Sequence, residues 1–105
     1  MTMEKLLELL KTVCTDSYEY AAPQGVTRCI VAHTYAGRSF YGDDANVLDI
    51  QKAQLDILTQ DISDTLSDDV CGVLREARLP YSVEAWKSYD DDWAAIRTIL
   101  QLELI

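Results

Sequence analysis

The hydrophobic pattern at the start of the chain predicts an amphipathic helix over residues 3–14. Apolar side chains recur there every three or four residues, and charged side chains occupy the other face. The apolar stripe is made of Met3, Leu6, Leu7, Leu10, Val13 and Cys14. The charged face carries Glu4, Lys5, Glu8 and Lys11. We expect this helix to pack on the rest of the fold by its apolar stripe.

Strands are predicted in the next third of the chain. Residues 18–20 precede Pro-Gln-Gly and read as a short strand that ends in a turn. Residues 28–35 are rich in β-branched, aromatic and small side chains, and Gly37 closes this second strand. Residues 42–46 form a polar loop by composition. From residue 47 to 59, apolar and polar positions alternate, which predicts a long strand with one covered face.

A second helix is expected to follow, with Asp61 as its cap and Pro80 preventing its continuation. Asp64 in the first turn, and Arg75 and Arg78 in the last turn, complement the helix dipole. The apolar face is made of Ile62, Leu66, Val70, Val73, Leu74 and Ala77.

Two more strands end the chain and define the fold class. Residues 81–89 and 94–104 alternate between apolar and polar positions, and Asp90, Asp91 and Asp92 form the loop between them. The resulting order is α-β-β-β-α-β-β. We therefore predict one α+β domain over residues 1–105, with a mainly antiparallel sheet of four to five strands and two helices packed on one face.

The net charge and the hydropathy of the sequence limit the classes of partner that we expect for this protein. Eighteen acidic residues against nine basic ones give a formal charge of −9 and a pI near 4.3, and the basic residues are scattered along the sequence. We therefore expect no sequence-specific nucleic-acid binding, and repulsion from any DNA that passes nearby. The sequence contains no run of about 20 apolar residues that could span a membrane, and its N-terminal segment does not resemble a signal peptide. We therefore expect a cytosolic product.

The sequence offers little support for catalysis or cofactor binding. The three cysteines are far apart and read as small buried hydrophobes. His33 is the sole histidine and has no Cys, Asp or Glu at metal-ligand spacing. The acidic pairs and triplet do not match a calcium-binding loop, and the four glycines are isolated. We expect no catalytic residues, no metal and no cofactor.

The two tryptophans allow two interpretations. Trp86 and Trp93 flank the acidic turn of the last hairpin. Packing in the core or along the sheet edge is favoured, and an exposed anchor for a partner stays open.

The order and pattern of the elements resemble a known family over nearly the whole chain. The stretches that carry the likeness are Cys29-Ile-Val-Ala-His-Thr-Tyr, Phe40-Tyr-Gly-Asp-Asp-Ala-Asn, Asp49-Ile-Gln-Lys-Ala-Gln-Leu-Asp-Ile-Leu-Thr, Val73-Leu-Arg-Glu-Ala-Arg-Leu-Pro-Tyr and Ile96-Arg-Thr-Ile-Leu-Gln-Leu-Glu-Leu. They resemble the tail-completion, or tail-terminator, proteins of long-tailed bacteriophages and prophages. The likeness is one of pattern and order without an invariant motif, and Leu58 stands where an aromatic residue is common in the family.

The resemblance implies a virion structural protein, made in the host bacterial cytoplasm before assembly. It implies a homo-oligomeric ring, usually a hexamer, that binds the end of a finished tail tube and offers a surface to the head connector. A ring needs two different patches on each subunit. Loops 35–46 and 89–93 are our candidates for the protein interface, through Tyr35, Phe40, Tyr41, Asp43, Asp44, Asp90, Asp91 and Trp93.

Three alternatives remain open at this point. Another head-tail joining protein of the same size would show a similar pattern. A cellular ligand-binding or regulatory α+β module would need a pocket with convergent polar groups. An enzyme comes third.

Overall fold

The predicted fold class and element order are confirmed. The computed structural model describes residues 1–40 and 47–104, and for residues 35–40 and 47–50 it describes the backbone only. The described elements are α1 (Met3–Leu10), β1 (Ser17–Glu19), β2 (Cys29–Phe40), β3 (Val47–Thr59), α2 (Leu66–Glu76), β4 (Tyr81–Asp90) and β5 (Ala95–Glu103).

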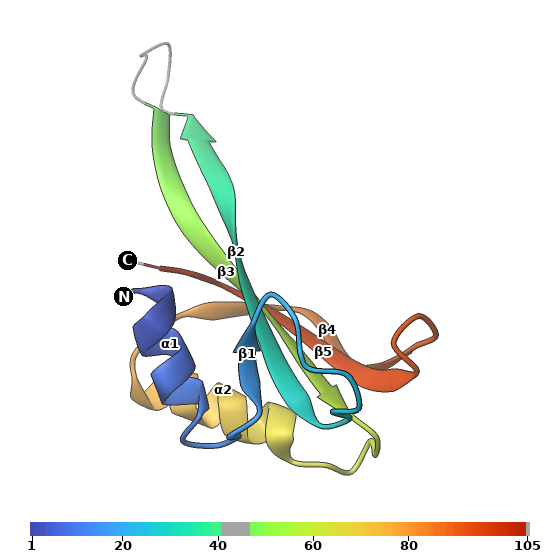
Figure 1. Cartoon of the computed structure of the whole chain (residues 1–105). Helices are drawn as coiled ribbons and strands as arrows, with labels where there is room; N and C mark the ends of the chain where they lie inside the picture. The colour runs from blue at the N-terminus through green and yellow to red at the C-terminus, as the bar shows by residue number, and fades with distance from the viewer. Residues whose placement is uncertain (41–46, 105) are drawn as a thin grey trace.

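The strands form one mixed sheet in the order β1-β2-β3-β5-β4 (Figure 1). Strands β2 and β3 make a long antiparallel hairpin, from Cys29 opposite Leu58 to Phe40 opposite Val47. β5 then pairs antiparallel with both β3 and β4. β1 is the exception, because it pairs parallel with β2. The sheet is therefore mainly antiparallel, as the hairpin pattern predicts.

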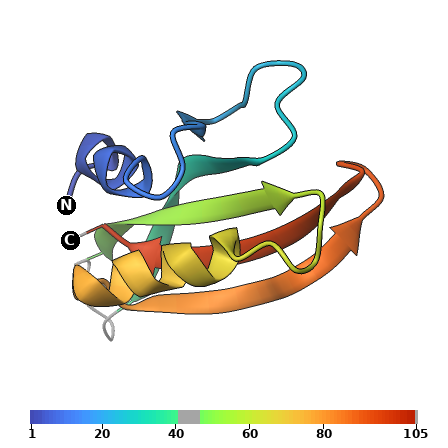
Figure 2. The same ribbon diagram turned by 90° about the horizontal axis from the view of Figure 1, so that it is seen from below.

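Both helices cover the same face of the sheet and bury the main core. α2 lies across β3 and β5 in Figure 2, and α1 packs beside it. The alternation along β3 puts its apolar odd-numbered residues on this face, and β5 contributes its even-numbered ones. The main core comprises Leu6, Leu10, Cys14, Ile30, Ala32, Ala53, Leu55, Ile57, Leu66, Val70, Cys71, Leu74, Leu100, Leu102 and Leu104.

A smaller apolar cluster occupies one end of the opposite face. It consists of Cys29, Val31, Leu58 and Ala95, covered by side chains of the segment between β1 and β2. The prediction that the cysteines are buried is confirmed for all three, which are free thiols. Burial raises the pKa of the Cys29 thiol, which keeps this sulfur a poor nucleophile.

Two predicted boundaries were wrong. α1 ends at Leu10 rather than at residue 14, and the chain turns at residues 11–13, where the Thr12 hydroxyl donates to the Leu9 carbonyl at 2.6 Å. Strand β2 does not end at Gly37. Gly37 lies opposite Ile50, and the pairing of β2 with β3 continues beyond it to Phe40.

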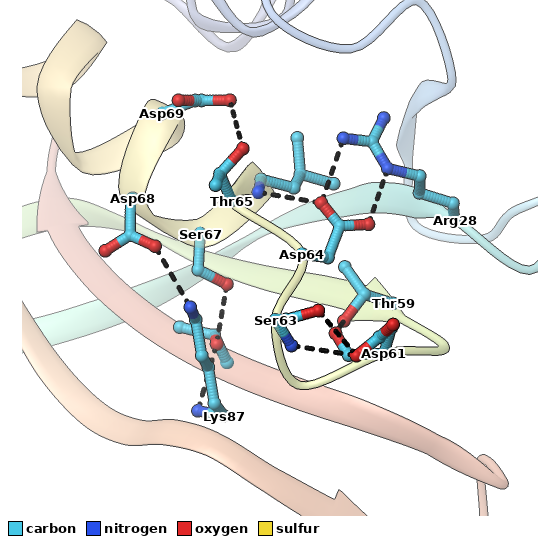
Figure 3. Close-up of polar contacts among 12 residues, drawn as sticks. Arg28, Thr59, Asp61, Ser63, Asp64, Thr65, Ser67, Asp68, Asp69 and Lys87 are labelled. Carbon is cyan, nitrogen blue, oxygen red and sulfur yellow. Dashed lines mark hydrogen bonds and ion pairs between the residues drawn. The ribbon is translucent and has the colours of Figure 1, made fainter.

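The start of the second helix also differs from the prediction. Ile62 is 63% exposed and lies before α2, which begins at Leu66. Asp61 caps a turn instead of the helix, because its carboxylate accepts from both the backbone N–H and the hydroxyl of Ser63 (Figure 3). Asp64 binds the first turn of the helix instead, because its Oδ1 accepts a hydrogen bond from the N–H of Leu66 at 3.0 Å.

Asp64→Ala is expected to lower the free energy of unfolding by about 1 kcal/mol at neutral pH, because the helix loses its capping carboxylate. The hydrogen bond from Arg28, with Nε at 2.8 Å, holds the pKa of Asp64 below its usual value in spite of partial burial. A carboxylate whose pKa is lower in the folded state stabilises the fold at pH values above its pKa in the unfolded chain, which is about 4. This stabilisation is lost as the pH falls through the pKa of the folded state. Urea titrations at neutral and acid pH should show that the variant loses less stability than the wild type when the pH is lowered.

Asp91→Ala is the matched control for this change. Asp91 is exposed and makes no ion pair within the described residues, so its loss should shift stability by less than about 0.5 kcal/mol. Equal effects of the two substitutions would contradict a capping role for Asp64.

β4 is an edge strand with an irregular ladder. Its pairing with β5 is regular from Tyr81 to Val83, after which register shifts occur between Val83 and Ala85 and between Ala85 and Ser88. Lys87 lies in the second irregularity with a φ of 46°, and its backbone N–H donates to the Thr98 hydroxyl at 3.1 Å. These are β-bulges, in which extra residues of one strand oppose a shorter stretch of the other.

Candidate interaction surfaces

The β2–β3 hairpin extends well beyond the rest of the sheet (Figure 1). β1 pairs with β2 only from Ile30 to Ala32, and β5 pairs with β3 only from Lys52 onward. Residues 33–40 and 47–51 therefore form a two-stranded ribbon, which we call the projecting ribbon. Apart from one bond from the Leu104 N–H to the Gln51 carbonyl, no other described strand extends its ladder.

Residues 35–40 of the first predicted interface loop lie in this projecting ribbon, where they belong to strand β2 and not to a loop. The backbone of Tyr35 and Phe40 lies in β2, while their side chains are outside the described part. Tyr41, Asp43 and Asp44 lie outside the described residues.

The second predicted loop is the turn between β4 and β5, residues 90–94, which we call the acidic turn. Asp90 organises it from within, because its Oδ1 accepts from the N–H groups of Asp92 and Trp93 at 2.9 and 3.2 Å. Its Oδ2 accepts from Arg97 Nη1 at 3.0 Å. Loss of water around the Asp90 carboxyl favours its neutral form, but the Arg97 and backbone hydrogen bonds outweigh this and lower its pKa. Asp90 is thus a structural residue of the turn.

The other side chains of the acidic turn face the solvent. Asp91 and Asp92 are exposed and make no ion pair with a described residue. Trp93 is 45% exposed, with Arg97 at 5.4 Å from its ring centroid. Trp86 is 43% exposed, and the Lys87 amino nitrogen lies 5.5 Å from its ring centroid. These exposed fractions contradict packing of the tryptophans in the core, and Trp86 lies on the edge strand β4.

The acidic turn and the projecting ribbon lie at opposite ends of the sheet. Thr59, at the far end of β3, is opposite Ile96, which follows the acidic turn, whereas Val47 begins β3 within the projecting ribbon. The twelve steps between Val47 and Thr59 correspond to roughly 40 Å of strand. The structure therefore does not join the two predicted loops into one site.

A polar network occupies the middle of the sheet face that the helices leave open. Asp56 is nearly buried, with a side chain 4% exposed, and its Oδ1 accepts from Arg97 Nη2 at 2.9 Å and Nε at 3.2 Å. His33 Nδ1 lies 3.9 Å from Asp56 Oδ2. Gln54 donates to Asp56 and accepts from Gln101, each at 3.3 Å. Arg97 also bonds Asp90, so this network connects the sheet face to the acidic turn.

The end of the sheet where β4 begins carries a shallow pocket that is wide open to solvent. It has a volume of about 460 Å³ and is lined by Arg75, Arg78, Leu79, Pro80 and Tyr81. α2 ends here in a Schellman motif, in which the Leu79 N–H donates to the Leu74 carbonyl at 2.9 Å. Arg78 occupies the left-handed position of this motif, with a φ of 57°, where glycine is usual.

A second hollow lies beside the smaller apolar cluster. It has a volume of about 540 Å³ and is bordered by residues 21–27, Cys29, Leu58, Gln60 and residues 93–95. Its lining is more apolar than polar.

Sequence reasoning missed the network and the α2-end pocket as sites. Asp56 and Arg97 are 41 residues apart, and only the register of β3 with β5 brings them together. The two arginines of the pocket were visible in the sequence, but only as complements of the helix dipole. Within residues 1–40 and 47–104, no three His, Cys, Asp or Glu side chains gather where they could hold a metal ion. The same residues contain no helix long and apolar enough to cross a membrane.

Comparison of the sequence with protein-family models and with curated proteins finds no match.

Proposed function

We propose that this protein is a virion assembly subunit that caps a finished phage tail tube as a homo-oligomeric ring and offers a surface to the head connector. The resemblance to tail-terminator proteins supplies the particular role. The geometry supports the more general part of the proposal, which is a subunit that works by joining other protein surfaces.

The projecting ribbon is the observation that carries the proposal. A two-stranded hairpin is marginally stable in water when no third strand or helix covers it. Residues 33–40 and 47–51 are paired almost entirely with each other and extend away from the main core (Figure 1). A neighbouring subunit or tube would supply the missing cover, and the open ladder edges supply hydrogen-bonding groups for it.

The charge of the chain is consistent with a ring through which DNA passes. A formal charge of −9 on each subunit opposes retention of a phosphate backbone. The same charge opposes crowding of subunits, so the contacts that hold a ring must bring opposite charges or apolar surface together.

Removal of the projecting ribbon is the experiment that tests this proposal. Replacing residues 37–50 by Asn-Gly would connect Ala36 to Gln51, which already lie opposite each other, through a tight hairpin turn. We expect the shortened chain to keep its stability within about 1 kcal/mol, since the ribbon lies outside the core. We expect the full chain to give rings in light scattering and negative-stain images, and the shortened chain to give none.

Circular dichroism and thermal unfolding of the shortened chain provide the control for folding. A folded, shortened chain that assembles as the full chain does would show that the projecting ribbon has no part in assembly. A full chain that forms no ring at any concentration, either alone or with tail tubes, would refute the proposed function.

The hollow of about 540 Å³ favours a second candidate, a ligand-binding module. Its volume falls within the range of about 300–1,000 Å³ that is common for small-molecule sites. Pools of small apolar molecules should then raise the unfolding temperature in proportion to the logarithm of their concentration. Stabilisation by one compound, together with a chain that never assembles, would favour this candidate over the ring.

A further inference from the structure

We infer that the acidic turn of one subunit docks in the pocket at the end of α2 of a second copy of this chain. This inference rests on the proposed function, because it names the two unlike patches that a ring requires. It concerns only described residues, none of which belongs to the projecting ribbon, and we expect ring formation to need both the ribbon and this contact.

The α2-end pocket has the chemistry to receive an acidic, aromatic segment. Two arginines line it, no carboxylate is among its lining residues, and Leu79 and Pro80 give it an apolar wall. Arg75 and Arg78 are exposed and make no ion pair with any residue in the described part of the chain. Arg75 Nη1 donates to the Tyr81 hydroxyl at 3.4 Å, but neither guanidinium has a carboxylate partner among the described residues. In a chain of charge −9, two such arginines beside apolar surface are a local exception.

The acidic turn presents the complementary groups. Asp91 and Asp92 are exposed and unpaired within the described residues, and the half-exposed indole of Trp93 follows them directly. Arginine binds carboxylates through two parallel hydrogen bonds, and an indole packs well on proline and tyrosine. The turn is also held in shape by the Asp90 hydrogen bonds and by Arg97 beneath Trp93. A turn that is already ordered loses little conformational entropy on docking.

The two patches cannot meet within one subunit. The pocket includes Tyr81, the first residue of β4, and the acidic turn begins at Asp90, the last residue of the same strand. The length of this strand keeps them roughly 30 Å apart. Each patch must therefore find its partner on another molecule, and unlike patches at opposite ends of one subunit give a head-to-tail contact, which closes into a ring when its rotation allows.

A charge swap tests this contact. One variant carries Arg75→Glu and Arg78→Glu, and the other carries Asp91→Lys and Asp92→Lys. Each variant alone places like charges in its own contact, so we expect its self-association to fall at least about ten-fold below that of the wild type. In an equimolar mixture every contact is again between opposite charges, and association should return. Sedimentation velocity at low ionic strength measures all three samples, because added salt screens such contacts.

Two controls make the result specific. Lys5→Glu with Lys11→Glu introduces the same charge change as Arg75→Glu with Arg78→Glu, at exposed positions on α1 and at its C-cap, and should leave association as in the wild type. A single chain that carries all four swaps has a reversed but complementary contact and should also associate. This chain guards against a variant that fails only because it folds poorly, which circular dichroism checks directly.

The outcomes separate this inference from the proposed function. Rings that form equally well in both charge variants would overturn the docking contact and leave the ring intact. Open filaments that follow the swap pattern would support the contact and overturn the ring. A wild-type chain that stays monomeric at about millimolar concentration would overturn the contact. A mixture of two folded variants that fails to associate would also overturn it.

Discussion

Leu100→Ala should lower the free energy of unfolding by about 3 to 4 kcal/mol. Leu100 is fully buried in β5, opposite Leu55 of β3, on the face that α2 covers. Truncation of such a side chain removes its transfer free energy and leaves a cavity that the surrounding strands cannot close. Urea unfolding followed by circular dichroism measures the change, and an unchanged slope with denaturant would show that the transition remains the same.

Val83→Ala is the matched control for this substitution. Val83 lies directly opposite Leu100 in the β4–β5 ladder, but it is 49% exposed, because the helices do not cover this part of the edge strand. Its truncation should lower stability by less than about 1 kcal/mol. Losses of similar size from the two neighbours would contradict a core that ends at β5.

Arg97→Met should lower stability by about 3 kcal/mol. Asp56 would keep its place in the sheet face at 4% exposure, but without the guanidinium that now donates to it from Nε and Nη2. A carboxylate left almost buried without its cation carries a large desolvation penalty. The half-exposed ring of Trp93 would also lose its cation. Chemical unfolding at neutral pH measures the loss.

Arg78→Met is the corresponding control. It removes an exposed arginine that has no ion pair in the described part of the chain, so stability should change by less than about 0.5 kcal/mol. The double variant Asp56→Asn with Arg97→Met should recover part of the stability, because an amide replaces the stranded charge. A double variant that is no more stable than Arg97→Met alone would contradict the role assigned to Asp56.

Alternation and helical periodicity were sufficient to predict the fold class. β3 and β5 have one apolar face each, and α1 and α2 have apolar stripes, so burial on one side of the sheet follows from the sequence. Gly37 misled the prediction, because a glycine in an exposed hairpin remains in the ladder when its partner strand is in place. Ile62 fits a helical spacing, but the hydrogen bonds of Asp61 and Asp64 start the helix later.

Features that depend on pairing between distant segments could not be predicted. The parallel pairing of β1 with β2, and the contact of Asp56 with Arg97, both require the register of strands far apart in the sequence. Expected exposure and aromatic content point to the two interface loops, but these properties give no information about the distance between the loops. The α2-end pocket arises from the chain reversal between α2 and β4, which brings the two arginines beside Tyr81.

The bulges of β4 limit the directions in which copies of this protein can associate. A flat edge of ten residues could add a strand from another molecule, and that growth has no natural end point, as in amyloid. Here the ladder of the edge strand is interrupted between Val83 and Ser88, and Glu84 and Lys87 bring charge to the irregular part. Sideways extension of the sheet is thereby discouraged, while contacts at the two ends of β4 remain available. In the head-to-tail association that we propose, growth through these ends stops once the ring closes.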